Sequence, residues 1–198
     1  MSRQRGKSSP SGTGRFRIIG GQWRGRRIQF PGTGQLRPTP DRVRETLFNW
    51  VSPLIEGARC LDLYAGSGAL GLEALSRHAA ECVFVERDAK ALDAIREHMV
   101  ELNSGNAVCV SSDALAYLRR CALDFDLIFL DPPFDEDPWA RLLHQIVAGK
   151  LLRTGGRIYM EMLADKGSPE LPKGLELLRS KRAGRVGYHL VSVRQEIP

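Results

Sequence analysis

Apolar runs and segments of helical spacing alternate along the chain from about residue 60 to its end. The run from Cys60 to Tyr64 carries a single acid, Asp62, and predicts a short buried strand. Further strands are expected at 81–86, 107–110, 125–131 and 156–161, and helices at 69–79, 88–102, 114–120 and 138–148. This alternation predicts an α/β fold with a doubly wound, mostly parallel sheet and helices on both faces. Residues 175–181 and 188–194 are expected to close the sheet as an antiparallel pair.

A different pattern precedes this body. Residues 1–15 are rich in Ser, Gly and Arg and lack apolar periodicity, so we expect a disordered basic tail. Two β-prone runs, 16–19 and 23–30, flank Gly20-Gly21, a dipeptide that favours a hairpin turn. The aromatic residues of these runs either stack on RNA bases or pack on the body, and the sequence leaves both open. They are Phe16, Trp23 and Phe30.

A helix is expected after this hairpin, with Thr39 as its N-cap, Pro40 as its first residue and Pro53 beyond its end. Its apolar stripe consists of Val43, Leu47, Trp50 and Val51. The residues left on its other faces are Arg42, Arg44 and Glu45. We therefore expect a tail at 1–15, an RNA-contacting extension at 16–53 and a single larger domain at 54–198.

Charge is unevenly distributed along the 198 residues. Residues 1–40 contain nine Lys or Arg and no acid, whereas the rest of the chain contains 20 basic and 23 acidic residues. A basic arm on a nearly neutral body favours a polyanionic partner, although it would also serve as a solubilising tail. The arginines expected to contact RNA are Arg15, Arg17, Arg24, Arg26, Arg27 and Arg37.

Other classes of protein are disfavoured by the composition. The sequence has no apolar run of membrane-spanning length and no secretory signal, so we expect a cytoplasmic protein without a membrane partner. The four cysteines are widely spaced and the four histidines are scattered, so reduced thiols and no metal are expected. We also expect a monomer.

The first strand leads into a glycine-rich turn, Gly66-Ser-Gly-Ala-Leu-Gly71, which fits the spacing G-x-G-x-x-G. Glycines allow a sharp turn and the close approach of a ligand, but this spacing alone is also compatible with a simple strand-to-helix turn. The second strand ends at Glu86, twenty residues past Gly66, where a carboxylate can accept hydrogen bonds from ribose hydroxyls. Strand, turn, helix and acid in this order predict a nucleotide-type cofactor site.

The fourth strand ends in Asp131-Pro-Pro-Phe134. Together, Leu61-Asp-Leu-Tyr-Ala-Gly-Ser-Gly68 and Asp131-Pro-Pro-Phe134 resemble the motifs of S-adenosylmethionine-dependent methyltransferases that modify exocyclic amines of bases. A third segment, Arg37-Pro-Thr-x-x-x-x-Arg-Glu-x-Leu-Phe-Asn49, makes the resemblance close. It is similar to the corresponding segment of the small-subunit (16S) ribosomal RNA guanine-N2 methyltransferase family.

This resemblance implies a class I, Rossmann-like methyltransferase fold with seven strands, one of them reversed. It implies S-adenosyl-L-methionine as cofactor, ribosomal RNA or the small-subunit particle as partner, and a guanine N2 amine as acceptor, with guanine 966 as the family's target. Gly66 and Gly68 would approach the methionine part of the cofactor, whose amino group Asp62 would help to hold. Glu86 would bind the ribose and Asp113 the adenine amino group; Asp113 also suits a helix N-cap.

The same resemblance assigns the chemistry to residues 131–134. A guanine 2-amino group is a weak nucleophile because its lone pair is delocalised into the ring. Asp131 and a carbonyl of the rigid Pro132-Pro133 turn would accept its two N–H groups and orient it for in-line attack on the sulfonium methyl. Phe134 would stack on a base taken out of its helix.

Three other functions remain open. Adenine-N6 methylation fits Asp-Pro-Pro-aromatic equally well, although Phe134 stands where Tyr is common and no insertion is long enough for a DNA-recognition domain. A nicotinamide-dependent dehydrogenase fits the glycines and Glu86 but not residues 131–134. A non-catalytic RNA-binding protein would explain the basic arm and leave the glycine turn without a role.

Overall fold

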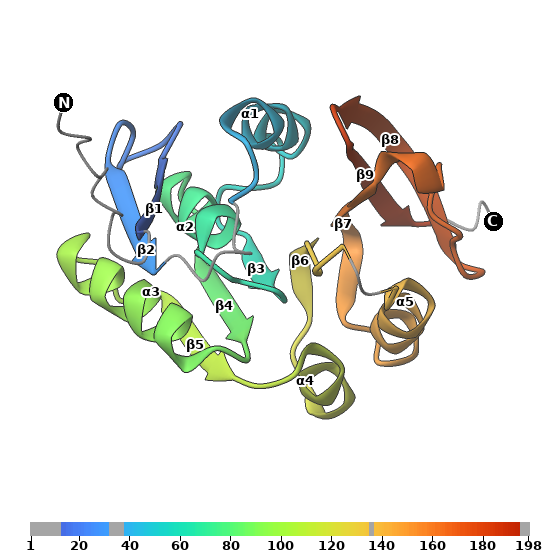
Figure 1. Ribbon diagram of the computed structural model, residues 1–198. Coiled ribbons are helices and arrows are strands. Elements are labelled where there is room, and N and C mark those ends of the chain that lie inside the picture. The colour runs from blue at the N-terminus through green and yellow to red at the C-terminus, as the bar shows by residue number, and fades with distance from the viewer. Residues whose placement is uncertain (1–12, 32–37, 135–136, 195–198) are drawn as a thin grey trace, which may run out of the picture.

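A seven-stranded sheet forms the centre of the computed structural model, which describes residues 13–31, 38–134 and 137–194 (Figure 1). Its strands lie in the order β5-β4-β3-β6-β7-β9-β8. Their bounds are β3 (Arg59–Asp62), β4 (Glu81–Glu86), β5 (Ala107–Ser111), β6 (Phe125–Leu130), β7 (Leu152–Leu163), β8 (Leu175–Ala183) and β9 (Val186–Val193). All pairings from β5 to β7 are parallel, and β9 runs antiparallel to both of its neighbours. The predicted doubly wound sheet with one reversed strand is confirmed.

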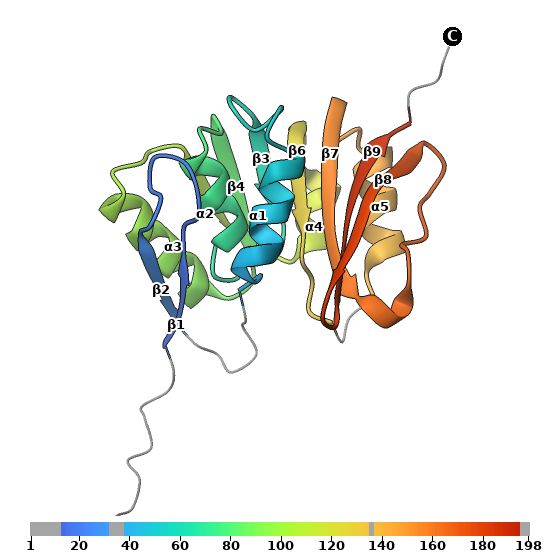
Figure 2. The same cartoon turned by 90° about the horizontal axis from the view of Figure 1, so that it is seen from above.

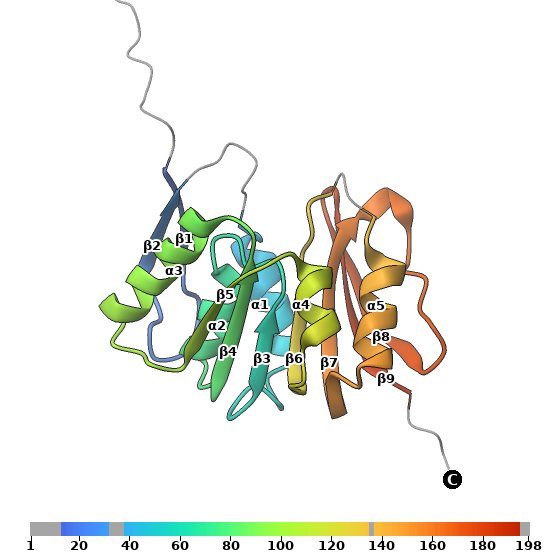
Figure 3. The ribbon, with the colours of Figure 1, turned by 90° about the horizontal axis from the view of Figure 1, so that it is seen from below.

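Helices cover both faces of this sheet. Three of them lie on one face, α1 (Asp41–Trp50), α2 (Ala69–Ser76) and α3 (Ala89–Glu101), as Figure 2 shows. The opposite face carries α4 (Ala114–Arg120) and α5 (Trp139–Ala148) (Figure 3). Alternate residues of the buried strands point to opposite faces of the sheet. Phe129 therefore packs toward α1 and α2, and Ile128 packs toward α4 and α5. The two apolar clusters hold the sheet between two helical layers.

The order of the strands fixes where a ligand can bind. From β3 the chain moves outward through β4 to β5, and it then crosses back to β6 on the other side of β3. Strand order therefore reverses between β3 and β6. In open parallel sheets, the crevice at the carboxyl ends of the strands beside this reversal is the usual ligand site.

The N-terminal segment forms the predicted antiparallel hairpin, with β1 (Thr13–Arg17) paired to β2 (Arg27–Pro31). Its aromatic residues are buried in the same apolar cluster as α1, α2 and α3, which favours packing on the body over stacking on RNA; they are Phe16, Trp23 and Phe30. The Gly20-Gly21 turn was predicted wrongly, because the strands are joined by the whole stretch 18–26.

Gly20 and Gly21 instead dock this hairpin onto the end of α2. The Gly20 carbonyl accepts a hydrogen bond of 2.6 Å from the Ser76 hydroxyl, and the next residues bond back to Ser76 through Gln22 N and Trp23 N. Gly21 has a φ of +76°, and a Cβ there would lie 1.7 Å from the Ser76 carbonyl oxygen. Only glycine fits a contact this close.

Helix α1 departs from expectation at two residues. Thr39 is not its N-cap: Pro40 takes that position without a side-chain hydrogen bond, and the Thr39 hydroxyl points to Asp131. Arg44, expected away from the core, has no exposed surface and lies among hydrogen-bond acceptors. The helix ends at Trp50, before Pro53.

At the edge of the sheet opposite β5, the strands β8 and β9 form the closing antiparallel pair. The register of this pair shifts between Leu177 and Arg179, which marks a bulge in the outermost strand. A 3-10 turn, η1 (Ala164–Lys166), follows β7. Across the described ranges, the structure contains no helix that is long and apolar enough to cross a membrane.

Candidate active site

Acidic side chains gather at the carboxyl ends of the strands beside the reversal. Asp62 is the last residue of β3, Glu86 the last of β4, and Asp131 follows β6 directly. Glu161 lies near the end of β7, where Leu130 is paired with Met160. Burial raises the pKa of Asp62 to about 7, and the neighbouring carboxylates of Asp131 and Glu86 add to this rise. Three of the predicted acids, Asp62, Glu86 and Asp131, thus lie near one another at this edge of the sheet.

The glycine turn lies against Glu86. Gly66 N donates to Glu86 Oε2 at 2.9 Å, and Gly66 and Gly68 both have positive φ, at +49° and +76°. Gly71 has a different role, because a Cβ there would lie 2.2 Å from the Phe84 ring. The first two glycines shape the turn, and the third lets α2 approach the sheet.

Glu86 is held by backbone groups. Besides Gly66 N, its carboxylate accepts hydrogen bonds from the N–H groups of Arg87 at 2.8 Å and Asp88 at 3.0 Å. These contacts fix its orientation at the mouth of the turn. A carboxylate has about four acceptor positions, so capacity remains for a ligand hydroxyl.

Asp62 serves the fold at this point. Its carboxylate is buried and accepts a hydrogen bond of 2.9 Å from Gly71 N in the first turn of α2. This contact ties the end of β3 to the start of the helix, and it opposes the rise in the pKa of Asp62. The expected contact of Asp62 with a cofactor amino group stays a prediction.

Asp131 has a side-chain partner in Thr39, whose hydroxyl lies 3.4 Å from Asp131 Oδ2. Desolvation raises the pKa of Asp131 to about 7, and the Thr39 hydroxyl opposes this rise.

Glu161 is a buried acid that interacts with Asp131, and it accepts a hydrogen bond of 2.8 Å from the Tyr159 hydroxyl. Burial and the Asp131 carboxylate raise the pKa of Glu161 well above its usual range, against the pull of the Tyr159 and Thr39 hydroxyls and Arg44.

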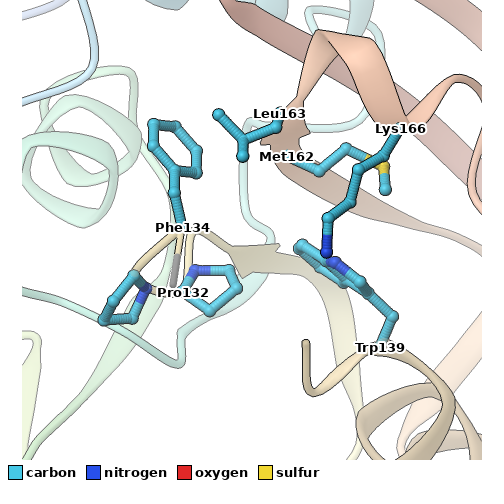
Figure 4. Close-up of a pocket in the computed structure, with 7 residues that line it drawn as sticks. Pro132, Phe134, Trp139, Met162, Leu163 and Lys166 are labelled. Atoms are coloured by element: carbon cyan, nitrogen blue, oxygen red, sulfur yellow. The ribbon is translucent and has the colours of Figure 1, made fainter. Parts of the chain in front are cut away.

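The residues after Asp131 form one wall of a small hollow (Figure 4). Pro132 is buried, whereas 42% of Phe134 is exposed. The far wall comes from the end of β7, η1 and the start of α5, and its residues are Met162, Leu163, Lys166 and Trp139. The ring of Phe134, three residues after Asp131, therefore has exposed surface that a planar partner could cover.

Asp113 caps α4, as the sequence predicts, by accepting a hydrogen bond of 2.9 Å from Ala116 N. It follows β5, two strands away from the reversal, and is exposed. Its proposed contact with an adenine amino group stays a prediction.

The hairpin presents its arginines to solvent: Arg15, Arg17, Arg24, Arg26 and Arg27 are all exposed. Arg17 lies 3.6 Å from Asp41, at the start of α1. No ion pair holds the other four within the described part of the chain. Arg37 lies outside the described residues.

A buried ion pair that the sequence analysis missed links the hairpin to the body. Arg44 and Glu73 have no exposed surface and lie 3.4 Å apart. Glu73 accepts hydrogen bonds of 2.8 Å from the N–H groups of Ile19 and Gly20, and Arg44 donates to the carbonyls of Arg17 at 2.7 Å and Thr39 at 3.1 Å. The signal was present, since Thr39 and Arg44 are fixed positions of the Arg-Pro-Thr-x-x-x-x-Arg-Glu pattern.

In the part of the chain that the structure describes, no group of three or more His, Cys, Asp or Glu side chains is arranged to hold a metal ion. The four cysteines are free thiols, of which Cys60 and Cys82 are buried.

Comparison with known proteins adds an independent observation. The family model of conserved hypothetical protein 95 matches residues 16–192. The chain is 44% identical over 184 residues to ribosomal RNA small subunit methyltransferase D of Escherichia coli K12, covering 93% of each chain. It is 38% identical to the protein of the same name from Haemophilus influenzae, covering 92% of this chain and 96% of that one.

The fold agrees with this relationship. The solved structure of the Escherichia coli protein yhhF superposes with a TM-score of 0.84 at 41% identity, covering 91% of this chain and 98% of that one. A match over nearly the whole length excludes a shared fragment. The chain therefore belongs to the family of conserved hypothetical protein 95, together with relatives named ribosomal RNA small subunit methyltransferase D.

Proposed function

We propose that this protein transfers a methyl group from S-adenosylmethionine to the exocyclic 2-amino group of a guanine in 16S ribosomal RNA. The observation that carries the proposal is the position of Asp131-Pro-Pro-Phe134, which follows β6 at the strand reversal, next to the strand that leads into the Gly66 turn. The names of the relatives support ribosomal RNA of the small subunit as the substrate.

The acids at this edge of the sheet suit this cofactor. S-adenosylmethionine carries a sulfonium and an ammonium charge, and Asp62, Glu86, Asp131 and Glu161 provide carboxyl groups whose mutual repulsion a cation would relieve. Glu86 would accept the ribose hydroxyls, Gly66 and Gly68 would leave room for the methionine part, Asp62 would help to hold its ammonium group, and Asp113 would accept from the adenine amino group. When bound, the cofactor supplies an electrophilic methyl group.

Residues 131–134 would prepare the target amine. Asp131 would accept one N–H, and a carbonyl of the Pro132-Pro133 turn the other, so that the nitrogen lone pair points at the methyl group. The nitrogen gains positive charge as it attacks, which the Asp131 carboxylate stabilises. Proline rings fix φ, and the two acceptors therefore need little reorganisation. Phe134, with its exposed ring, would stack on the base once it leaves its helix.

The hairpin would form the RNA-contacting part of the molecule. Its exposed arginines, together with Arg37, would offer guanidinium groups to phosphates. Its aromatic residues are buried in the apolar core and are not available for stacking on bases. RNA affinity at this surface would accordingly come from charge more than from base stacking.

Replacing Asp131 by alanine tests the proposal. The Asp131→Ala variant should lose methyl transfer to ribosomal RNA and bind S-adenosylhomocysteine nearly as tightly as the unaltered protein. Asp124→Ala is the matched control, because Asp124 is an exposed acid that precedes the other end of β6. Activity would be followed by mass spectrometry of nucleosides, which separates methylated guanine from methylated adenine.

The same measurement on ribosomal RNA from cells lacking the protein identifies the modified base. Loss of N2-methylguanine supports the proposal. Loss of N6-methyladenine would instead show that the protein is an adenine-N6 methyltransferase. Near-normal turnover by Asp131→Ala would show that Asp131 takes no part in the mechanism.

A further inference from the structure

We propose that Thr39 is a positioning residue for Asp131. Its hydroxyl, fixed by two flanking prolines and by Arg44, holds the Asp131 carboxylate in the orientation that accepts an N–H of the target amine. The inference rests on the role proposed above for Asp131. It makes the segment before α1, 92 residues away in sequence, a part of the methyl-transfer site.

The contact is partly buried. Thr39 is 5% exposed, and its Oγ1 atom lies 3.4 Å from Asp131 Oδ2. That distance is long for an O–H···O hydrogen bond, but catalytic hydrogen bonds tighten when substrate closes the site. The same hydroxyl also lowers the pKa of Glu161, so it serves Asp131 and Glu161 and not the helix that follows it. A threonine in an N-cap would have bonded to its own helix, and this one does not.

The backbone of Thr39 is held from both sides. It lies between Pro38 and Pro40, and the residue before a proline is confined to extended conformations. Its carbonyl accepts a hydrogen bond of 3.1 Å from Arg44 Nε, and Arg44 is in turn fixed by its buried pair with Glu73. The Thr39 hydroxyl therefore projects from a rigid backbone, and a rigid donor is what is needed to preorganise the Asp131 carboxylate.

The surroundings of Asp131 explain why such a donor matters. The titratable groups that interact with it are Asp62 from β3 and Glu161 and Tyr159 from β7, and Glu161 in turn interacts with Arg44 from α1. Two of these are acids that disfavour the charged form of Asp131. The Thr39 hydroxyl acts in the opposite direction, because a donor stabilises the carboxylate, which is the form that accepts the N–H.

Thr39→Val tests the inference, since valine has the shape of threonine without the hydroxyl. At saturating S-adenosylmethionine and small-subunit RNA, its kcat should fall about tenfold, the effect expected for one hydrogen bond to a charged group. Its Kd for S-adenosylmethionine should stay within about twofold of the unaltered value. The acidic limb of its kcat–pH profile should move to higher pH, because losing the donor raises the pKa of Asp131.

Two matched variants separate positioning from stability. Thr39→Ser keeps the hydroxyl and should restore both kcat and the acidic limb. Thr46→Val makes the same substitution in α1, where the hydroxyl donates to the Arg42 carbonyl, and should leave both unchanged. Melting temperatures of all three variants would show how far each affects folding.

The outcomes distinguish this inference from the proposed function. An inactive Asp131→Ala with a Thr39→Val that keeps its kcat and acidic limb would overturn the role of Thr39 alone. That role is also overturned if Thr39→Ser loses as much activity as Thr39→Val, or if Thr39→Val weakens cofactor binding without lowering kcat. An active Asp131→Ala would overturn both.

Discussion

Glu86 shows how backbone contacts can orient a single carboxylate. Three backbone N–H groups orient its carboxylate. Among the described residues, no charged side chain forms a hydrogen bond with it. An acid held in this way is ready to accept further hydrogen bonds without reorganising. The sequence predicted its position at the end of a strand, because an acid there after a glycine turn is a local pattern, and its contact with a ribose stays a prediction.

Glu86→Ala should weaken S-adenosylmethionine binding about tenfold to a hundredfold, since a charge-assisted hydrogen bond is worth on the order of 1.5–3 kcal/mol. Isothermal titration calorimetry measures the change. Glu97→Ala, an exposed acid on α3, serves as the control. An unchanged dissociation constant would mean that the ribose binds elsewhere.

Asp62 should make the stability of the unliganded protein depend on pH. Its pKa rises from 3.8 in the unfolded chain to about 7 in the fold, so the folded state holds a proton more tightly. The resulting stability is present below about pH 4 and is lost as the pH rises to about 7.

An Asp62→Asn variant can still accept the hydrogen bond from Gly71 N but has no proton to lose. Between about pH 4 and about pH 8, its free energy of unfolding should fall by roughly 2–4 kcal/mol less than that of the unaltered protein. Urea titrations at both pH values would measure this. Parallel declines in the two proteins would show that Asp62 stays ionised in the fold.

At the scale of elements, local periodicity was sufficient for most of the body. The strand at 81–86 and the helix at 114–120 have the predicted bounds. β7 begins at Leu152, earlier than predicted, because Gly155 and Gly156 interrupt its apolar pattern where its pairing with β6 is also irregular. The pairing of Arg44 with Glu73 had only a partial signature: Arg44 is a fixed position of the Arg-Pro-Thr-x-x-x-x-Arg-Glu pattern, whereas its partner depends on how α1 and α2 pack.

The hairpin is the element whose function the sequence left most open. Its aromatic side chains face the core, so the RNA contact that we propose for it would come from its exposed arginines. Reversing the charge of Arg24, Arg26 and Arg27 together should weaken RNA binding. Each lost phosphate contact should also reduce the slope of log affinity against log salt by roughly 0.7 to 0.9.

RNA affinity at two salt concentrations measures the effect, with cofactor affinity as a control for folding. Replacing the same three residues by lysine preserves the charge and should preserve most of the salt slope. If the charge-reversed protein keeps its affinity and its slope, RNA must bind across another surface.

At the scale of the whole molecule, the hairpin and the body share one core and one buried ion pair. A buried charge that loses its partner destabilises a protein by about 3–5 kcal/mol. Glu73 would keep Arg77 at 2.8 Å, so Arg44→Ala should cost about 3 kcal/mol, the lower end of that range. Urea denaturation measures it, and Arg42→Ala, on the exposed side of the same helix, should be nearly neutral.

The bulged outer strand β8 bears on how the molecule behaves among its own copies. The free edge of a sheet is a template on which another chain can add a strand, and long flat edges promote aggregation. β8 interrupts its edge with the register shift at Leu177–Arg179, and it carries Arg179, Lys181 and Arg182 along the rest of its length. Two such edges would repel one another and align poorly, which disfavours the pairing of two copies of the protein through β8.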